Sequence, residues 1–405
     1  MAKASPAFTN FTAGELSPRL DGRTDLQKYF NGCKKLQNFI VHPHGGASRR
    51  PGTIFVREVK NSAHNARLIP FEFNVEQTYI LEFGDEYFRI HKDGGTVVDG
   101  SSNPIEVTTP YAHTDLAKLK FTQSADVMYV AHPDFSPRKI TRTSHTAWTI
   151  AEVDFLRGPF QDENTTATTF LASGRTGTVN VTASTNTFVS TDVGRLIKVH
   201  DGVTKITGFT SATVVATAVQ TNADGRAELM PSYAATTISA HEGDPSSTGL
   251  EHNDRYQDTA GQFVAQGFKV GQKITVTGFT TSANNQTSAI IVKVTEDTLL
   301  LAPSSDLTAE AAGDSVTIAG DLTATTDWSL GAFSTTTGFP SAVAFYEQRL
   351  VFASTTQQPQ TLFFSVGGSF EDFADGTDAD DALTYTLGSN QVNIIRYLQA
   401  GRVLL

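Results

Sequence analysis

The chain has 405 residues, 39% of them hydrophobic and 18% charged, which is typical of a soluble globular protein with two or three cores and excludes a disordered chain. Its formal net charge of −11 argues against broad affinity for DNA phosphates, which depends on Lys and Arg contacts. No apolar run approaches the roughly 18 residues of a membrane helix, and the single cysteine, Cys33, cannot form an internal disulfide, which fits a reducing cytoplasm.

Residues 1–60 are expected to form an extended N-terminal arm. They include ten Lys/Arg and four Asp/Glu, so the arm carries a net charge of +6 and leaves −17 for the rest of the chain. These charges are dispersed among Gly, Pro and apolar residues, unlike the dense basic block of a typical nucleic-acid-binding tail. Pairing with acidic protein surfaces is therefore favoured, and contact with DNA stays open as the alternative.

Residues 61–160 have the pattern of short strands. QTYILEFGDEYFRIHKDGG alternates apolar residues from Tyr79 to Phe83, turns at Gly84-Asp85 and returns through Phe88 and Ile90, which predicts a hairpin. Further strands are predicted up to Ala131, over Lys139–Arg142 and from Trp148. Their close spacing predicts a meander in one sheet, like the blade of a β-propeller.

Residues 161–334 are rich in Thr, Ala, Ser and Gly and poor in aromatics, which indicates a separate inserted module. Two segments, Val193–Val219 and Val270–Val294, share the order Val-Gly, strand, Gly-Phe-Thr, polar turn, strand. This order predicts a duplicated small β-unit, such as two SH3-like or immunoglobulin-like barrels.

Residues 335–405 return to the blade-like pattern. FPSAVAFYEQRLVFAST, QTLFFSV, ALTYTL and VNIIRYL read as short apolar strands between polar turns, and GRVLL falls inside what should be a further strand. Because a propeller closes only when its last blade meets its first, the sequence predicts an incomplete propeller in a longer polypeptide. The predicted fold class is all-β: an incomplete β-propeller-like domain with an inserted small β-barrel or immunoglobulin-like module and an extended N-terminal arm.

Signatures of chemistry are scarce. The sequence has no GxGxxG, P-loop, GxSxG or HExxH motif, so no catalytic residue, cofactor or metal site is assigned and an enzyme is not expected. The HPH stretch at His42 and His44 lacks a third ligand and reads as a plain loop. Glu371 and Asp372 are adjacent on one predicted strand and would point to opposite faces, which excludes a glycosidase pair.

The acid-rich stretch FEDFADGTDADD is the best candidate for cation binding. It offers the carboxylates of Asp375, Asp378, Asp380 and Asp381 at short spacing, in an order that does not match an EF-hand. A solvated loop between strands is the alternative.

Three stretches carry a family resemblance: NFTAGELSPRLDGRTDLQKYFNGCKKLQNFIVHPHGGASRRPGTIFV, ADVMYVAHPDFSPRKITR and PSAVAFYEQRLVFASTTQQPQTLFFSVGGSFEDF. Together they resemble the tail nozzle proteins of short-tailed bacteriophages, also called tail tubular protein B. The resemblance covers about residues 8–160 and 338–405, and the Thr-rich segment departs from it. It implies a structural virion protein, made in the host bacterial cytoplasm, that forms a hexameric ring at the distal end of the tail.

In such a ring the chain would contact the tail adaptor protein, tail fibres or spikes and the host outer surface, and DNA would pass through without sequence-specific binding. The arm would then be an assembly strap, although packing on its own propeller stays open. Candidate contacts between subunits are Arg19, Arg23, Tyr29, Phe30, Phe39, Arg49 and Arg50. The acidic loop would be a gate or cation loop. The alternative function is a receptor-binding propeller at the tail tip that recognises host glycans.

Overall fold

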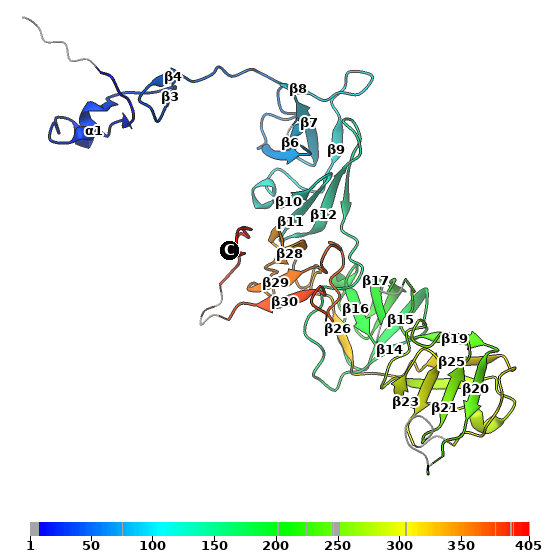
Figure 1. Ribbon diagram of the computed structural model, residues 1–405. Helices are drawn as coiled ribbons and strands as arrows, with labels where there is room; N and C mark the ends of the chain where they lie inside the picture. Colours follow the sequence, from blue (N-terminus) through cyan, green and yellow to red (C-terminus); the bar gives the residue numbers. More distant parts are fainter. Residues whose placement is uncertain are drawn as a thin grey trace, which may run out of the picture. The chain divides into compact units, whose positions relative to one another are not determined.

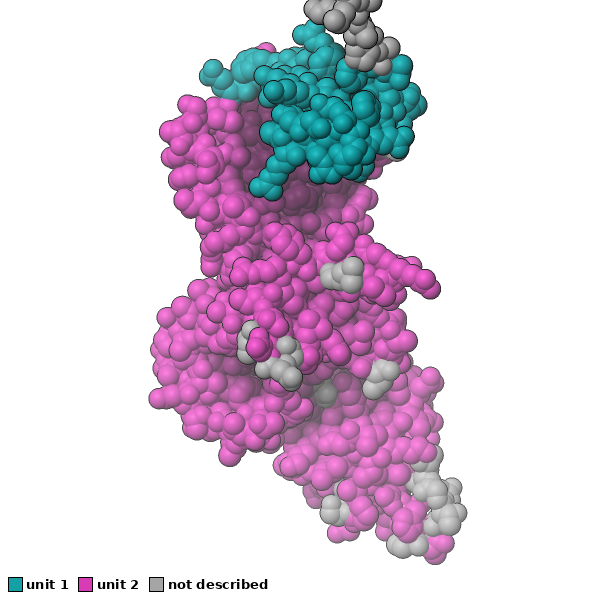
Figure 2. Space-filling view, turned by 90° about the vertical axis from the view of Figure 1, so that its left-hand side faces the viewer, with its two compact units in different colours: residues 1–58, 93–96 teal, residues 59–92, 97–405 magenta. Residues whose placement is uncertain are grey.

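The computed structural model describes residues 8–74, 76–200, 202–222, 225–244, 246, 252–303, 306–376, 378–388, 391 and 393–404. These residues form a nearly all-β protein with several separate sheets, as the sequence predicts (Figure 1). Two compact units make up the chain: residues 1–58 with 93–96, and residues 59–92 with 97–405 (Figure 2). We call them the N-terminal unit and the main unit. None of the described helices is long and apolar enough to cross a membrane.

Short elements form the N-terminal unit. They are a parallel strand pair, a turn of 3-10 helix, a single turn of α-helix and a hairpin: β1 (Gly14–Glu15) with β2 (Gly32–Cys33), Pro18–Leu20, α1 (Gln27–Phe30), and β3 (Phe39–Val41) with β4 (Ala47–Arg49). The hairpin closes where His42 donates its N–H to the Gly46 carbonyl at 2.8 Å, with Gly45 at φ 105°. Residues 51–58 form no strand or helix.

The main unit begins with a first blade-like sheet. Its antiparallel strands follow the predicted alternation and are β5 (Arg67–Glu72), β6 (Thr78–Gly84), β7 (Tyr87–Lys92) and β9 (Glu106–Thr108). The turn between β6 and β7 places Glu86 at φ 62°, and a two-residue strand, β8 (Gly95–Thr96), follows β7 in the chain. The predicted hairpin at residues 79–90 is thereby confirmed.

Two further antiparallel meanders complete the blade-like part. The second blade contains β10 (Lys120–Ser124), β11 (Val127–His132), β12 (Phe135–Arg142) and β13 (Trp148–Glu152). The third contains β27 (Ala342–Tyr346), β28 (Arg349–Ala353), β29 (Thr361–Phe364) and β30 (Leu383–Thr386). The meander predicted from the strands near Ala131, Lys139–Arg142 and Trp148 is confirmed, and residues 109–119 separate its sheet from the first one, so residues 61–160 contain two sheets.

The three blades pack on one another through β11. Along this strand Met128 and Val130 belong to a core shared with the first blade, whereas Tyr129 and Ala131 belong to a core shared with the third. Successive side chains of a strand point to opposite faces, so β11 is buried on both sides. This two-sided burial accounts for its continuous apolar sequence and resembles the stacking of neighbouring propeller blades.

The inserted segment contains two sheets with separate hydrophobic cores. The first has the order β14-β15-β18-β17-β16-β26, and we call it the outer module. Its strands are β14 (Phe170–Ala172), β15 (Thr178–Ala183), β16 (Leu196–Val199), β17 (Gly202–Ser211), β18 (Val214–Val219) and β26 (Trp328–Leu330). Trp328 stacks on Phe170 with ring centroids 3.9 Å apart.

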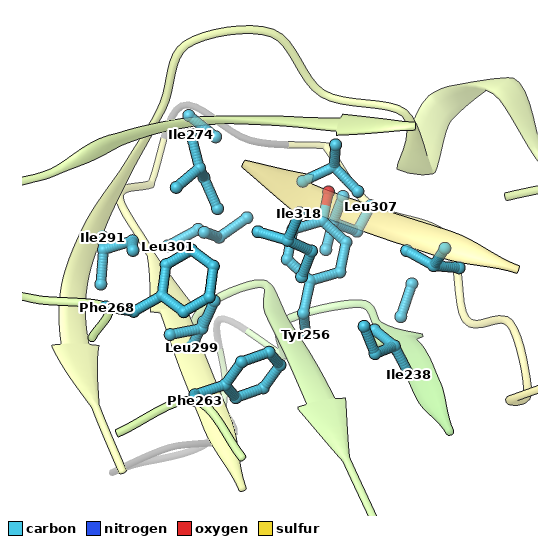
Figure 3. Close-up of a cluster of buried hydrophobic side chains, with 14 of the residues drawn as sticks. Ile238, Tyr256, Phe263, Phe268, Ile274, Ile291, Leu299, Leu301, Leu307 and Ile318 are labelled. Carbon is cyan, nitrogen blue, oxygen red and sulfur yellow. The ribbon is translucent and has the colours of Figure 1, made fainter. Parts of the chain in front are cut away.

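The second sheet, which we call the inner module, has the order β19-β25-β22-β23-β24-β21-β20. Its strands are β19 (Ser232–Ala235), β20 (Ile238–His241), β21 (Arg255–Asp258), β22 (Lys273–Thr277), β23 (Ala289–Val294), β24 (Thr298–Leu301) and β25 (Val316–Gly320). Figure 3 shows its core, in which Tyr256, Phe263, Ile274 and Ile318 point toward one another between the strands. Strand order differs between the modules, so the repeated Gly-Phe-Thr pattern marks two hairpins in unlike sheets.

The two modules are nested. After the inner module the chain returns to the outer sheet, where β26 pairs with β16. The ends of the inner module meet, since Gly320 donates its N–H to the Pro231 carbonyl at 2.8 Å. The ends of the whole insertion also meet, through the bridge between Phe160 and Gly331. Each module therefore interrupts its host at two adjacent points.

The C-terminal segment departs from the expected pattern. Its described residues, 393–404, contain no strand beyond an isolated bridge between Ala400 and Leu404, so the predicted strand in VNIIRYL is wrong. Ile395 and Leu398 instead pack, partly buried, against the core formed by Val351, Leu362 and their neighbours in the third blade. Short apolar stretches predict burial more securely than they predict strand pairing.

The nested connection predicts that the inner module is dispensable for its host. Replacement of residues 232–319 by a short Gly/Ser linker should leave the outer module folded, because the linker joins two points that already touch and loop closure costs little. Trp328 is the probe, with Trp148→Phe removing the second of the two tryptophans. An emission spectrum like that of the parent is expected, whereas the spectrum of a solvated indole would show that the modules share stability.

A buried carboxylate organises the end of β21 in the inner module. Asp258 is fully buried and accepts hydrogen bonds from Thr237 Oγ1 at 2.5 Å, from Tyr233 Oη at 3.1 Å and from the N–H groups of Ala260 and Gln262 at 3.0 and 3.1 Å. Burial alone would raise the pKa of Asp258, but these donors outweigh it and lower the pKa below its ordinary value. The ionised form is therefore the one that the fold stabilises.

Asp258→Asn should lower the free energy of unfolding of the inner module by about 2–3 kcal/mol at pH 7, because the amide presents an NH₂ group to donors that need an acceptor. The folded pKa is depressed, so the stabilisation is complete above the unfolded value of about 3.9 and is lost as pH falls through the folded value. Urea unfolding measures this at pH 7 and at pH 3. The difference in free energy of unfolding between the parent and Asp258→Asn should be smaller at pH 3. Asp306→Asn, at an exposed position, is the control. An equal loss of stability in this control would refute the stabilising role of the Asp258 carboxylate.

Candidate functional site

The N-terminal unit lacks a hydrophobic core of its own. Among its described residues only Gly32 and Gly45 are buried, and neither has a side chain to contribute. Polar contacts connect its segments, such as the 2.8 Å hydrogen bond from the Leu36 N–H to Glu15 Oε2. Apolar burial is the main favourable term in folding, so these residues need another surface to bury their apolar side chains.

Large apolar side chains of this unit are exposed. Phe55 is 77% exposed and Ile54 84%, in the stretch without secondary structure. The remaining ones are Phe8, Phe30, Phe39, Ile40 and Val56. Of the aromatic contacts predicted from sequence, Phe30 and Phe39 are thus exposed, whereas Tyr29 is half-buried and meets Phe30 edge-on with ring centroids 5.8 Å apart. We call Phe30, Phe39, Ile40, Ile54 and Phe55 the apolar set.

The predicted arginines lie in the same unit and are exposed. Arg23 binds Asp25 through two hydrogen bonds of 2.7 Å, which raise the pKa of Arg23 and lower that of Asp25. Arg19, Arg49 and Arg50 form no ion pair with any described residue. Three of the four guanidinium groups therefore remain available for carboxylates outside the unit.

The described residues of the acidic loop, 375, 376 and 378–381, are held mainly through their backbone. Arg349 donates to the carbonyl oxygens of Asp381 at 2.6 Å and Ala379 at 2.8 Å, and Gly367 donates its N–H to the Asp380 carbonyl at 2.8 Å. Gly376 approaches Asp381 so closely that a Cβ there would lie 2.0 Å from Oδ2. The turn is thus defined without its carboxylates meeting at one point.

The carboxylates of this loop have different surroundings. Asp375 is 73% exposed and lies 3.3 Å from Lys198 Nζ of the outer module. Asp381 accepts the N–H of Asp378 at 2.8 Å, and Asp378 and Asp380 are exposed. Among the described residues these four do not form a group of three oxygens close enough to share an ion within one chain.

Glu371 and Asp372, which precede the loop, each form an ion pair within the fold. Lys139 donates to both oxygens of Glu371 at 2.6 and 2.8 Å, and Tyr129 donates to one of them at 3.2 Å. Burial, with the neighbouring Glu371 charge, raises the pKa of Tyr129. Asp372 pairs with Arg157. Glu371 thus connects the third blade to β11 and β12, and Asp372 connects it to the segment after β13.

A cavity of about 310 Å³ lies between the second blade and the outer module. Phe155, Phe333 and Phe339 line it together with a charged pair, in which Arg138 Nη2 donates to Glu152 Oε1 at 2.8 Å. Aromatic walls with a few polar groups are common to many ligand pockets. No sequence motif marks these residues, because they come from segments far apart in the chain.

Sequence reasoning also missed a cluster of His64, Asp85 and His113 in the main unit. The HPH histidines, by contrast, behave as a loop: His42 hydrogen-bonds Ser48 Oγ at 2.8 Å and stacks on His44. In the missed cluster the His113 N–H is the largest of the influences that lower the pKa of Asp85. No short motif could reveal it, since its members lie in three separate segments.

No family model matches this chain, and a search of curated proteins finds no similar sequence.

Proposed function

We propose that the chain is a structural virion protein that assembles into the ring-shaped nozzle of a short bacteriophage tail, through which DNA is ejected. The proposal rests on the sequence resemblance of residues 8–160 and 338–405 to tail nozzle proteins. The observation that supports it best is the N-terminal unit, which exposes its apolar set and, among residues 8–58 and 93–96, buries no apolar side chain.

Neighbouring copies of the chain are the partner that suits this unit. Residues 1–60, which include most of this unit, carry a net charge of +6, while the remaining residues carry −17. Opposite charges steer the unit of one copy toward the main unit of the next. The apolar set would provide buried anchors, and Arg19, Arg49 and Arg50 would meet carboxylates at the rim. In this proposal the tail adaptor protein and fibres or spikes bind the finished ring.

The proposed strap can be tested by weakening its anchors. The full chain should form hexamers in multi-angle light scattering, and Phe30→Ser combined with Phe39→Ser should reduce them to monomers, because each exposed aromatic loses the apolar area that it buries on assembly. Deletion of residues 1–50 should do the same and leave the main unit folded.

Val264→Ser with Val270→Ser is the matched control, since these side chains are 54% and 64% exposed but lie in the inner module. It should assemble like the parent. Hexamers that persist without residues 1–50, or a parent chain that stays monomeric at high concentration, would refute the strap. Glycan binding by such a monomer would support the receptor-binding alternative.

The acidic loop is proposed as a gate in the ring. Six copies would bring clustered carboxylates to one constriction, where they repel DNA phosphates and one another unless cations bridge them. Because the four carboxylates do not converge within one chain, only the assembled ring could create such a cation site.

Replacement of Asp375, Asp378, Asp380 and Asp381 by Asn should therefore change the retention of DNA in particles and remove its dependence on divalent ions. The variant should fold, since the ion pair that it loses, between Asp375 and Lys198, is largely exposed and contributes little to stability. Leakage is measured by dye access to DNA with and without Mg²⁺. Unchanged retention would return the loop to a solvated turn.

A further inference from the structure

Three potential metal ligands meet on the first blade of the main unit. His64 lies in the segment before β5, Asp85 in the turn between β6 and β7, and His113 in the loop after β9. One ligand atom from each, the two imidazole nitrogens and a carboxylate oxygen, lies within 4.8 Å of the others. We propose that His64, Asp85 and His113 bind a zinc ion or a similar divalent transition-metal ion.

Both histidines face the carboxylate of Asp85. His64 Nδ1 lies 3.2 Å from Oδ2 and His113 Nδ1 lies 3.3 Å from Oδ1, so each nitrogen faces a different oxygen. In a tetrahedral zinc site with bonds of about 2.0 Å, neighbouring ligand atoms are about 3.3 Å apart, so the three atoms, now within 4.8 Å of one another, must draw closer to share one ion. Two imidazoles with one carboxylate suit zinc, whereas calcium and magnesium prefer oxygen ligands alone. Water would supply the fourth position.

The scaffold holds the ligands without help from an ion. Glu86 donates its N–H to the Tyr111 carbonyl at 2.8 Å and accepts the Thr109 N–H at 2.9 Å, which fixes the turn of Asp85 beside the His113 loop. The His113 N–H donates to Asp85 Oδ1 at 2.8 Å. Such preorganisation reduces the ordering that metal binding would otherwise require.

The side chains retain room to adjust. The two imidazole rings are parallel, with centroids 4.0 Å apart, so they must turn toward each other before both nitrogens face one ion. His64, Asp85 and His113 are about a third exposed, at 33%, 36% and 32%, which permits that rotation and lets an ion enter from solvent. Glu86 and Asp115, next to the ligands in sequence, add negative charge that attracts a cation.

The test is titration of the untagged full chain with zinc chloride by isothermal calorimetry after removal of metal by a chelator. One zinc ion per chain is expected. His64→Asn and His113→Asn should each weaken binding by more than the roughly 10–100-fold that loss of a supporting residue costs in metal sites. Cobalt gives a second readout, because tetrahedral Co²⁺ absorbs visible light and this band should disappear in both variants.

The matched control is His42→Asn with His44→Asn, which removes two stacked histidines and leaves the cluster intact. It should bind zinc like the parent. Asp85→Asn keeps an acceptor for the His113 N–H, so it tests the site even if a histidine variant fails to fold, and it should weaken binding at least tenfold. Absence of zinc binding in the parent, or equal binding in the parent and the cluster variants, would overturn the proposal. Neither result depends on whether the chain forms a nozzle.

Discussion

The fold depends on one strand that is buried on both faces. Met128 and Val130 of β11 pack toward the first blade, and Tyr129 and Ala131 pack toward the third. All four are at most 5% exposed, and full burial of one large apolar side chain contributes about 1.5–3 kcal/mol. The ion pair of Lys139 with Glu371 also connects the second blade to the third. The second blade is thus the common support of the cores on either side of it.

The nested modules follow from the same need to keep the blade contact intact. A long insertion between the second and third blades is compatible with their packing only if it leaves and returns at adjacent points. The bridge between Phe160 and Gly331 provides those points for the outer module, and the hydrogen bond from Gly320 to Pro231 does so for the inner one. Separate cores then let each sheet satisfy its own apolar side chains.

Local features of the fold could be predicted from sequence, and contacts between distant segments could not. The alternation from Tyr79 to Ile90 predicts the first hairpin because period and turn lie within a few residues. The break before Lys120 and the return of β26 to β16 depend on tertiary packing, which no window of sequence contains. The contact role of Phe30 and Phe39 stays a prediction, and the cluster of His64, Asp85 and His113 gave no local signal.

The order of the strands along the chain also affects how the protein is made. Tyr129 and Ala131 are synthesised early, but their partners Val343, Leu350 and Phe352 follow only after both inserted modules. At about 5–20 residues per second, the roughly 200 intervening residues take about 10–40 s to leave the ribosome. During this interval one apolar face of the second blade is uncovered while the inner module can already fold. The nascent chain therefore exposes an apolar sheet face, which is the kind of surface that chaperones bind.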